Sequence, residues 1–382
     1  MRVKISTYVI ALASLGTSVL GGPASTYNMQ KVVAPASRAP QSPPRWHAPT
    51  QRDSPFNYRY TGAGPVYDIR KFAAPVPDML YDNRVVVHWI TTTEGLDFFV
   101  TSFTGIGPDK DDPYGRNQFC TAVADVQTGG FSSYHLQGIP IDYSQSEVDV
   151  HYKDQYRWYS PSADNVSSVT WTSHSDEFAF NMTFDLAGPN MYYGGTGVYW
   201  WGTGYTHQWG APGAVTSGTF TINGTHHTVD TERSISWYDR QWGKGVSTVG
   251  WYWFPIILSD GTKLGAWVLP AKDDYNFAFA TIIHDDGTER TIDILPEIEK
   301  YDPVVSEKSN ITYHKTIILT FPETNGRLNI TAPQLKGDGG YGECYTENKN
   351  LIFFDAWAEV SGIWEGKHVT GFSVSEQKIF FG

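Results

Sequence analysis

The sequence lacks the short motifs that mark many common enzyme classes. It contains no Gly-x-Ser-x-Gly elbow, His-Glu-x-x-His helix, Cys-x-x-Cys pair, P-loop or dinucleotide fingerprint, which excludes the usual hydrolase, metalloprotease and dehydrogenase interpretations. The acidic stretch at residues 109–112 does not have the ligand spacing of an EF-hand. The adjacent His226 and His227 would point to opposite faces of a strand, which makes them poor joint metal ligands. We therefore expect no metal and no cofactor.

Long apolar runs and basic clusters are also missing. After the first residues, no stretch approaches the roughly 20 uninterrupted apolar residues that a membrane helix needs. The net charge is -12, and no run of Lys or Arg supplies a local basic face. Because the phosphates of nucleic acid require such a face, we expect neither nucleic acid nor a membrane span.

The N-terminus has the organisation of a signal peptide. Arg2 and Lys4 precede an apolar stretch that ends in small residues around Gly21. A transmembrane anchor is the alternative, but Ser, Gly and Thr residues at positions 14 and 16–18 interrupt the apolar run. We expect residues 1–21 to be removed, and residues 22–53, which are rich in Pro, Ala, Ser and Gln, to form a disordered leader.

Because of this signal-peptide pattern, we expect a glycoprotein that is secreted or retained in the secretory pathway. Five Asn-x-Ser/Thr sequons follow it, and we expect at least two to carry glycans. The two cysteines, Cys120 and Cys344, are compatible with a disulfide and equally with two buried thiols, because sequence does not show their geometry. The sequons lie at Asn165, Asn181, Asn223, Asn310 and Asn329.

Period-two patterns dominate the rest of the chain. Residues 178–186 alternate apolar with polar side chains, which places the sequon Asn181 on the outward face of a strand. Residues 259–262 and 285–288 are typical of tight hairpin turns, because Gly accepts positive φ. No helical periodicity of convincing length occurs, so we predict an all-β sandwich or barrel architecture with a boundary near residue 245. Further strands are predicted at residues 85–92, 96–103, 169–172, 219–222, 251–258, 264–269, 277–283 and 317–321.

The most specific motif spans residues 236–243, Ser-Trp-Tyr-Asp-Arg-Gln-Trp-Gly. It places one carboxylate, Asp239, among aromatic side chains that would lower the local dielectric and raise its pKa toward the range of a general acid. Arg240 would act in the opposite direction if the two residues paired. The motif is therefore either catalytic or a structural clamp at the domain junction.

A second aromatic cluster runs from residue 192 to residue 210 and ends in the same Gln-Trp-Gly sequence. Trp201, Tyr205 and His207 could line a pocket with His207 as acid or base, or they could form ordinary core. Aromatic residues make up 15% of the chain, with 14 Trp, which is an excess that suits a core, a ligand wall or a carbohydrate platform. Large rings interleaved with glycines favour the ligand wall.

The motif resembles the Asp-x-Gln-Trp-Gly signature of the hydroxyneurosporene synthase and kievitone hydratase group, a lipocalin-like superfamily that is also similar to fungal Diels-Alderases. The resemblance covers residues 55–382. It implies an N-terminal β-sandwich domain at residues 54–245 and a C-terminal lipocalin-like β-barrel domain at residues 246–382. The Trp-rich hairpin at residues 251–269 and the segments 362–366 and 369–376 share in the likeness.

In the hydratase branch of this superfamily the motif aspartate protonates the substrate, a role that carries over to Asp239. Arg240 stands where carotenoid hydratases commonly have histidine, and its guanidinium group suits a carbonyl or enolate better than proton donation. Gln241 and His207 are expected to assist Asp239 and Arg240. The resemblance and the aromatic pattern together predict a substrate pocket lined by Tyr193, Trp201, Tyr205, Trp237, Trp242, Trp251, Trp253 and Trp357.

The leading functional hypothesis is a cofactor-independent cyclase that guides a [4+2] or hetero-[4+2] addition on a small, apolar polyketide or terpenoid, with or without loss of water. A hydratase acting on a prenyl or carotenoid-like double bond is the close alternative. A carbohydrate-active protein and a lipocalin-like carrier without chemistry remain open as further alternatives.

Overall fold

The computed structural model describes residues 67–379 except 77, 110–116, 175–177, 187–188, 273–274, 285–287, 335–342 and 345–351. The expected signal peptide and leader, as well as most of the hairpin turn at residues 285–288, lie outside these residues. Within this part the chain forms strands and three short 3-10 turns but no α-helix, which confirms the all-β prediction. No helix among the described residues is long and apolar enough to cross a membrane.

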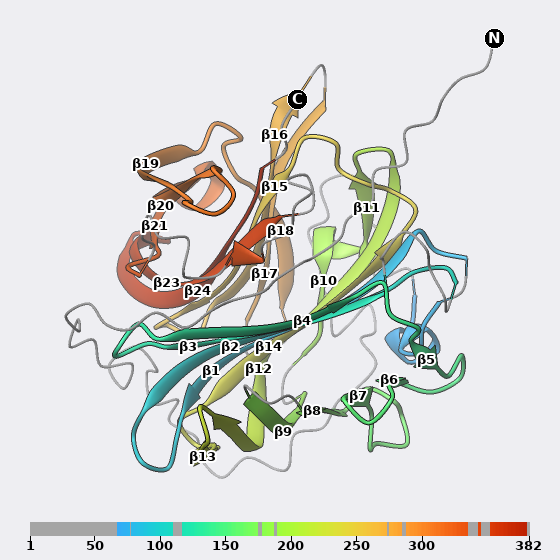
Figure 1. Cartoon of the computed structure of the whole chain (residues 1–382). Helices are drawn as coiled ribbons and strands as arrows, with labels where there is room; N and C mark the ends of the chain where they lie inside the picture. The colour runs from blue at the N-terminus through green and yellow to red at the C-terminus, as the bar shows by residue number, and fades with distance from the viewer. Residues whose placement is uncertain are drawn as a thin grey trace.

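The first sheet has 14 strands and takes up the N-terminal part of the chain (Figure 1). Its main path runs β4-β3-β2-β1-β14-β12-β9-β8-β7-β6-β5, and β10, β11 and β13 pair with β12. The strands are β1 Tyr81–Thr91, β2 Asp97–Ile106, β3 Gln118–Asp125, β4 Phe131–Gln137, β5 Asp142–Tyr143, β6 Asp149–Tyr152, β7 Tyr156–Tyr159, β8 Ser168–His174, β9 Phe178–Asp185, β10 Met191–Tyr192, β11 Val198–Trp201, β12 Gly204–Ile222, β13 Thr225–Thr228 and β14 Ile235–Gly243.

The second sheet has 10 strands and follows the order β18-β17-β16-β15-β24-β23-β21-β20-β19, with β22 on β23. Its strands are β15 Trp251–Leu258, β16 Lys263–Lys272, β17 Tyr275–Ile283, β18 Glu289–Asp293, β19 Glu299–Val305, β20 Thr312–Phe321, β21 Gly326–Thr331, β22 Glu343–Cys344, β23 Phe353–Trp364 and β24 Lys367–Lys378. The 3-10 turns are η2 Ile69–Phe72, η3 Tyr193–Gly195 and η4 Pro322–Thr324.

The change from one sheet to the other falls between Gly243 and Trp251. That segment contains the position predicted as a domain boundary, although the division into two domains stays a prediction. The hairpin turn predicted at residues 259–262 joins β15 to β16, with Gly261 at a φ of 93°. Each sheet curls, and every ladder in both is antiparallel.

Strands near the junction bury both of their faces, which explains the many large aromatic residues. On β15, Trp251 and Trp253 face the other sheet, whereas Tyr252 and Phe254 face the core of their own sheet. On β14, Trp237 faces the junction and Trp242 faces the core of the first sheet. Because successive side chains of a strand alternate, a strand between two apolar layers needs bulky residues at nearly every position.

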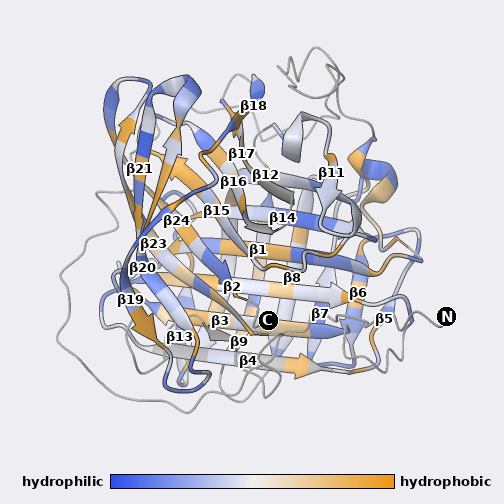
Figure 2. Ribbon diagram, turned by 90° about the horizontal axis from the view of Figure 1, so that it is seen from above, coloured by the Kyte–Doolittle hydropathy of each residue, from blue (hydrophilic) through white to orange (hydrophobic). Residues whose placement is uncertain are grey.

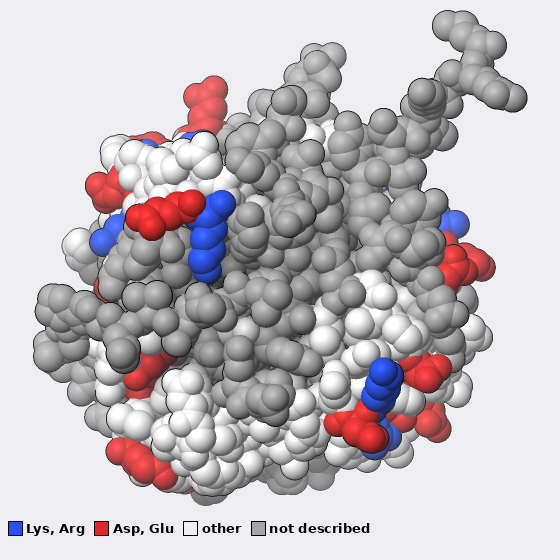
Figure 3. All heavy atoms as spheres, in the orientation of Figure 1, with Lys and Arg blue, Asp and Glu red and all other residues white. Residues whose placement is uncertain are grey.

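The outer surface is polar by comparison. Figure 2 shows hydrophobic segments along strands of both sheets, such as β15 and β24, and hydrophilic segments at many of the turns. On the face in Figure 3, acidic and basic side chains of the described residues lie in small mixed groups. The sequon residues Asn181, Asn223 and Asn310 are exposed, and Asn165 and Asn329 are partly exposed. Glycosylation of these sites stays a prediction.

The two cysteines lie on different sheets. Cys120 is buried on β3 of the first sheet, and the backbone of Cys344 belongs to β22 of the second. The side chain of Cys344 lies outside the described part, so the predicted disulfide stays a prediction.

Candidate active site

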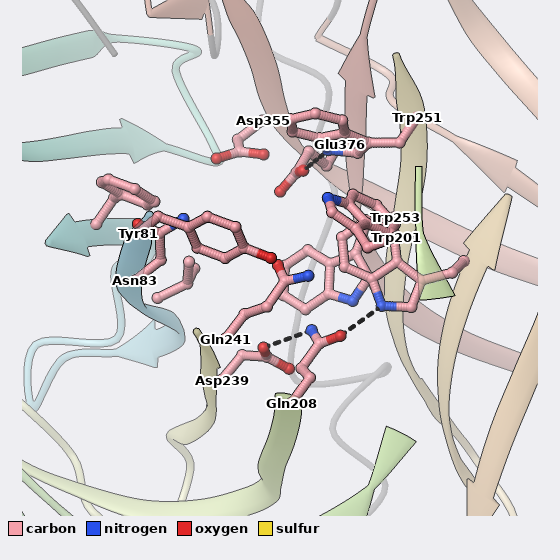
Figure 4. Close-up of a pocket in the computed structure, with 13 residues that line it drawn as sticks. Tyr81, Asn83, Trp201, Gln208, Asp239, Gln241, Trp251, Trp253, Asp355 and Glu376 are labelled. Carbon is pink, nitrogen blue, oxygen red and sulfur yellow. Dashed lines mark hydrogen bonds between the residues drawn. The ribbon is translucent and has the colours of Figure 1, made fainter. Parts of the chain in front are cut away.

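A cavity lies where the two sheets meet. The volume that the centre of a water molecule can occupy is about 60 Å³. This is several times the roughly 10–15 Å³ that a single water needs on the same measure. Strands of both sheets contribute to its wall, and six of the 13 lining residues are aromatic (Figure 4). The lining residues are Tyr81, Asn83, Val85, Phe103, Trp201, Gln208, Asp239, Gln241, Trp251, Trp253, Trp267, Asp355 and Glu376.

Asp239 is the buried acid of the first-sheet wall. It lies on β14 opposite Gly210 of β12, and its side chain is 4% exposed. A Cβ atom at position 210 would lie 3.2 Å from Asp239 Oδ2 and 3.3 Å from Trp237 Nε1, so the glycine leaves room for both groups. Burial raises the pKa of Asp239 to about 7, although the hydrogen bond from Gln208 and the nearby polar groups of Tyr193 and Trp237 oppose the rise.

The orientation of Gln208 is fixed by its neighbours. Its Oε1 accepts hydrogen bonds from Tyr199 Oη and from Trp267 Nε1, the latter at 3.0 Å. Because both neighbours act as donors here, the amide nitrogen must face Asp239, and Nε2 donates to Asp239 Oδ1 at 2.7 Å. Asp239 Oδ2 is buried and has no hydrogen-bond partner among the described residues, so it is the oxygen available to a ligand.

Tyr193 supports Asp239 from the turn η3. Its hydroxyl accepts a hydrogen bond from Trp253 Nε1 at 3.2 Å, which connects the turn to the second sheet. The backbone on both sides of Tyr193 is anchored to that sheet, because Tyr192 N donates to the Glu289 carboxylate at 3.2 Å and Gly194 N donates to Thr281 Oγ1 at 2.9 Å. The aromatic wall beside the acid is therefore held in place by both sheets.

Several residues predicted from the sequence do meet at the cavity. Asp239, Gln241, Trp201, Trp251 and Trp253 line it. Tyr193, Trp237 and Trp357 belong to the apolar cluster around the cavity without lining it. The predicted aromatic wall thus combines residues of β11, β14 and β15 with the turn η3.

Arg240 is not at the cavity, contrary to the expectation that it would hold a carbonyl there. Because it follows Asp239 on a strand, its side chain points to the opposite face, into the core of the first sheet. Its Nε and Nη2 donate to Asp82 at 3.2 and 2.9 Å, and the guanidinium group lies 4.6 Å from the centre of the Trp242 ring. Arg240 is therefore part of a buried ion pair that involves neither Asp239 nor the ligand space.

His207, Tyr205 and Trp242 are also placed away from the cavity. His207 stacks on Trp242 with ring centres 5.1 Å apart, and burial lowers the pKa of the imidazole. Tyr205 is 60% exposed and packs edge-on against Trp200 on the outer side of the β11-β12 hairpin. None of these three residues lines the cavity, and their predicted acid–base and substrate-binding roles stay predictions.

Eight of the lining residues were not predicted as site residues from the sequence. Gln208 could have been found from the sequence, because it begins the second Gln-Trp-Gly segment just as Gln241 begins the first. The two glutamines are direct partners in the β12-β14 ladder. Asn83 follows Gln241 across the next ladder, so three amides form a row on the same face. The eight residues are Tyr81, Asn83, Val85, Phe103, Gln208, Trp267, Asp355 and Glu376.

Two curled antiparallel sheets that enclose a pocket with aromatic and acidic lining residues are typical of a lipocalin-like architecture. The AttH-like family model matches residues 110–343, which is more than half of the chain. The protein therefore belongs to the AttH-like family, and the lipocalin-like superfamily inferred from the motif is confirmed.

Two curated relatives are similar to part of the chain. Kievitone hydratase from Fusarium solani subsp. phaseoli is 35% identical over 130 residues, which cover 33% of this chain and 37% of the relative. Dehydratase asqC from Emericella nidulans is 25% identical over 226 residues, which cover 56% of this chain and 62% of the relative. The matched segments span less than two thirds of either relative. Both relatives are named as enzymes, which confirms the expected enzymatic class of the family.

Solved structures share the fold over most of the chain. Kievitone hydratase from Nectria haematococca has a TM-score of 0.72 at 23% identity, covering 84% of this chain and 94% of that one. An AttH protein from Nitrosomonas europaea has a TM-score of 0.61 at 17% identity, covering 83% and 98%. CghA with Sch210972 has a TM-score of 0.53 at 12% identity, covering 80% and 94%. These likenesses establish the common fold.

Proposed function

We propose that the protein is a hydro-lyase that adds water to, or removes it from, a small and largely apolar natural product. The proposal rests on the placement of Asp239 in the wall of a cavity lined by aromatic residues. Burial there raises the pKa of Asp239 to about 7. A carboxyl group with that pKa holds its proton near neutral pH and is able to donate it. The names of the two curated relatives, a hydratase and a dehydratase, support the same class.

The cavity suits protonation of a carbon–carbon double bond. Neutral Asp239 would donate its proton to one alkene carbon, and the positive charge would develop on the other carbon among the faces of Trp201, Trp253 and Trp267. Water then adds to the cation and loses a proton to complete the alcohol. Dehydration is the same sequence reversed, with the Asp239 carboxylate removing the carbon-bound proton.

The lining also indicates what kind of substrate would fit. Six aromatic side chains line the cavity, and the amides of Asn83 and Gln241 are polar groups on its wall. Such a wall suits an apolar skeleton that carries one or two oxygen functions. A prenyl or polyketide-derived molecule has this character.

A cyclase of the Diels-Alderase type is the second candidate. The observation in its favour is the row of amides formed by Gln208, Gln241 and Asn83, which could hold and polarise a carbonyl of a diene or dienophile. The fold shared with CghA is compatible with this candidate. The placement of Arg240 weakens it, because the cation expected at the carbonyl is bound to Asp82.

The deciding experiment incubates the purified protein with kievitone and with an extract of the producing organism in H2(18)O. Hydration is expected to add 20 Da, dehydration to remove 18 Da, and intramolecular cyclisation to change retention time without a change of mass. The Asp239→Asn variant is expected to lower the rate about 100- to 10,000-fold, because the general acid is lost. Mass spectrometry of initial rates measures both outcomes.

Asp302→Asn is the matched control, because Asp302 is exposed and has a φ of 53°, a conformation that suits Asn well. Full activity of Asp239→Asn would contradict the acid assignment. Retention of a compound without turnover would indicate a carrier. Binding to polysaccharide or hydrolysis of a glycoside would favour the carbohydrate-active alternative.

We also propose that the protein enters the secretory pathway and is glycosylated. The signal-like N-terminus and the exposure of Asn181, Asn223 and Asn310 support this proposal. Protein secreted from a eukaryotic host is expected to lose the mass of at least two glycans after enzymatic deglycosylation. An unchanged mass would contradict the proposal.

A further inference from the structure

Three carboxyl groups line the cavity, and the hydro-lyase proposal uses only one of them. Asp239 belongs to the first sheet, whereas Asp355 on β23 and Glu376 on β24 belong to the second. Asp355 and Glu376 are direct partners in the β23-β24 ladder, so their side chains lie next to each other on one face. Figure 4 shows this pair on the opposite side of the group of lining residues from Asp239 and Gln208.

Glu376 is held in place by the aromatic wall. Trp251 Nε1 donates a hydrogen bond to Glu376 Oε1, and Trp253 is its direct neighbour across the β15-β24 ladder. Glu376 is 9% exposed, and burial raises the pKa of its carboxyl group even though Trp251, Asp355 and the charge of Lys378 oppose the rise. Burial therefore favours the protonated form of Glu376 beside its ladder partner Asp355.

Two properties of Asp239 support a shared cavity between this acid and the Asp355–Glu376 pair. Its Oδ2 is buried and has no hydrogen-bond partner among the described residues. The negative charge of Glu376 also raises the pKa of Asp239, which means that the two walls interact electrostatically. The cavity therefore has an acid on each side.

We propose that the Asp355–Glu376 pair is the acid–base group that exchanges a proton with the reacting water. Asp239, on the opposite side of the cavity, exchanges a proton with the carbon atom. The proposal rests on the hydro-lyase function. It identifies the pair as a second acid–base centre of the same site.

The proton and oxygen transfers balance without a further reactant. In hydration, Asp239 donates a proton to one alkene carbon, the π electrons form the new C–H bond, and the other carbon becomes the cation. The oxygen of a water molecule bonds to that cation while the ionised pair accepts one of the water protons. The products are the alcohol, ionised Asp239 and the protonated pair, and proton exchange with water restores both groups. In dehydration the protonated pair donates to the departing hydroxyl group, and Asp239 removes the proton from carbon.

The different solvent exposure of the two walls indicates which acid exchanges a proton with water and which with the carbon atom. Asp355 is partly exposed, so its side of the pair is in contact with solvent. Asp239 is 4% exposed and lies beside Trp237 and Tyr193, where an apolar carbon skeleton is the better neighbour. The division of roles follows from these two environments.

Isotope exchange separates the two roles. Kievitone and the extract compounds that gain or lose water are incubated in D2O and in H2(18)O with wild type, Glu376→Gln, Asp355→Asn and Asp239→Asn. The glutamine at 376 still accepts from Trp251 but takes up no proton. We expect the two pair variants to lose (18)O incorporation at least about 100-fold while they continue to exchange deuterium onto the alkene carbon within about threefold. Asp239→Asn is expected to lose both.

Glu359→Gln is the matched control, because Glu359 is also on β23, is half-buried and has a pKa raised by burial, but does not line the cavity. Its two rates are expected to equal those of wild type. Near-ultraviolet circular dichroism reports folding, and Asp355→Asn provides the test if Glu376→Gln does not fold.

Each remaining outcome overturns a specific part of the scheme. Wild-type (18)O incorporation in both pair variants would overturn the role of the pair and leave the role of Asp239 intact. Loss of both isotopes in folded pair variants would overturn the division of labour. Absence of water addition, water loss and deuterium exchange in wild type would overturn the hydro-lyase function and the role of the pair with it.

Discussion

A buried aspartate lies at each face of β14, and the two aspartates have different hydrogen-bond partners. On the core face, Arg240 forms an ion pair with Asp82 of the neighbouring strand β1, and Asp82 is 2% exposed. On the cavity face, Asp239 is 4% exposed and is hydrogen-bonded by the neutral amide of Gln208. Both aspartates are buried, yet only one of them has cationic partners.

The pKa values of the two aspartates diverge for that reason. Burial alone would raise both, but Arg240 and Arg84 together hold the pKa of Asp82 below its ordinary value. Asp239 has no such partner, and its pKa rises to about 7. The comparison shows that, at similar burial, charge pairing separates an ionised carboxylate from a carboxyl group of raised pKa.

Removing the charge of Asp82 should have the largest effect on stability. Asp82→Asn leaves the guanidinium groups of Arg84 and Arg240 buried without their carboxylate. We expect the free energy of unfolding to fall by about 3–5 kcal/mol, because an uncompensated buried charge is costly. Urea unfolding followed by tryptophan fluorescence measures this change.

Asp149→Asn provides the matched control for Asp82→Asn. Arg157 donates two hydrogen bonds to Asp149, both at 2.9 Å, so the pair has similar geometry, but it lies at the surface. We expect this control to lose less than about 1 kcal/mol. Equal losses in the two variants would mean that burial does not distinguish the two ion pairs, and the comparison would fail.

Local alternation was sufficient to predict much of this arrangement. The strand containing the Asp-Arg-Gln-Trp-Gly motif places Asp239 and Gln241 on one face and Arg240 and Trp242 on the other. Applied to the whole motif, that rule would have separated Arg240 from Asp239 before the structure was known. The all-β fold and the Trp-rich hairpin followed from the same period-two pattern, because it reflects local geometry.

The second wall of the cavity could not be predicted in this way. Asp355 and Glu376 face Asp239 only because β15, β23 and β24 pair in a particular register and the two sheets then pack together. The tight turn at residues 365–366 sets the β23-β24 register locally, but the β15-β24 contact and the packing of the two sheets join segments that are far apart in the sequence. Asp82 is a similar case, since its partner Arg240 is on another strand of the same sheet.

The pH dependence of stability gives a smaller but sharper test of the comparison. Because the pKa of Asp239 is raised to about 7 from the ordinary value of 3.8, the folded protein holds a proton that the unfolded chain has released between those values. This group therefore destabilises the fold increasingly as pH rises to 7, and the effect is constant above that. Relative to wild type, Asp239→Asn should gain about 3 kcal/mol between pH 5 and pH 8.

Asp82→Asn should change in the opposite sense over acidic pH, which makes it the natural counterpart. The lowered pKa of Asp82 means that its ionised form stabilises the fold above the ordinary pKa and that this stabilisation is lost as pH falls. The stability deficit of Asp82→Asn should therefore shrink toward low pH, whereas the advantage of Asp239→Asn should grow toward neutral pH. Urea unfolding at a series of pH values measures both difference curves, in which the contribution of Glu376 largely cancels. Parallel curves would show that the two faces of β14 do not set different charge states.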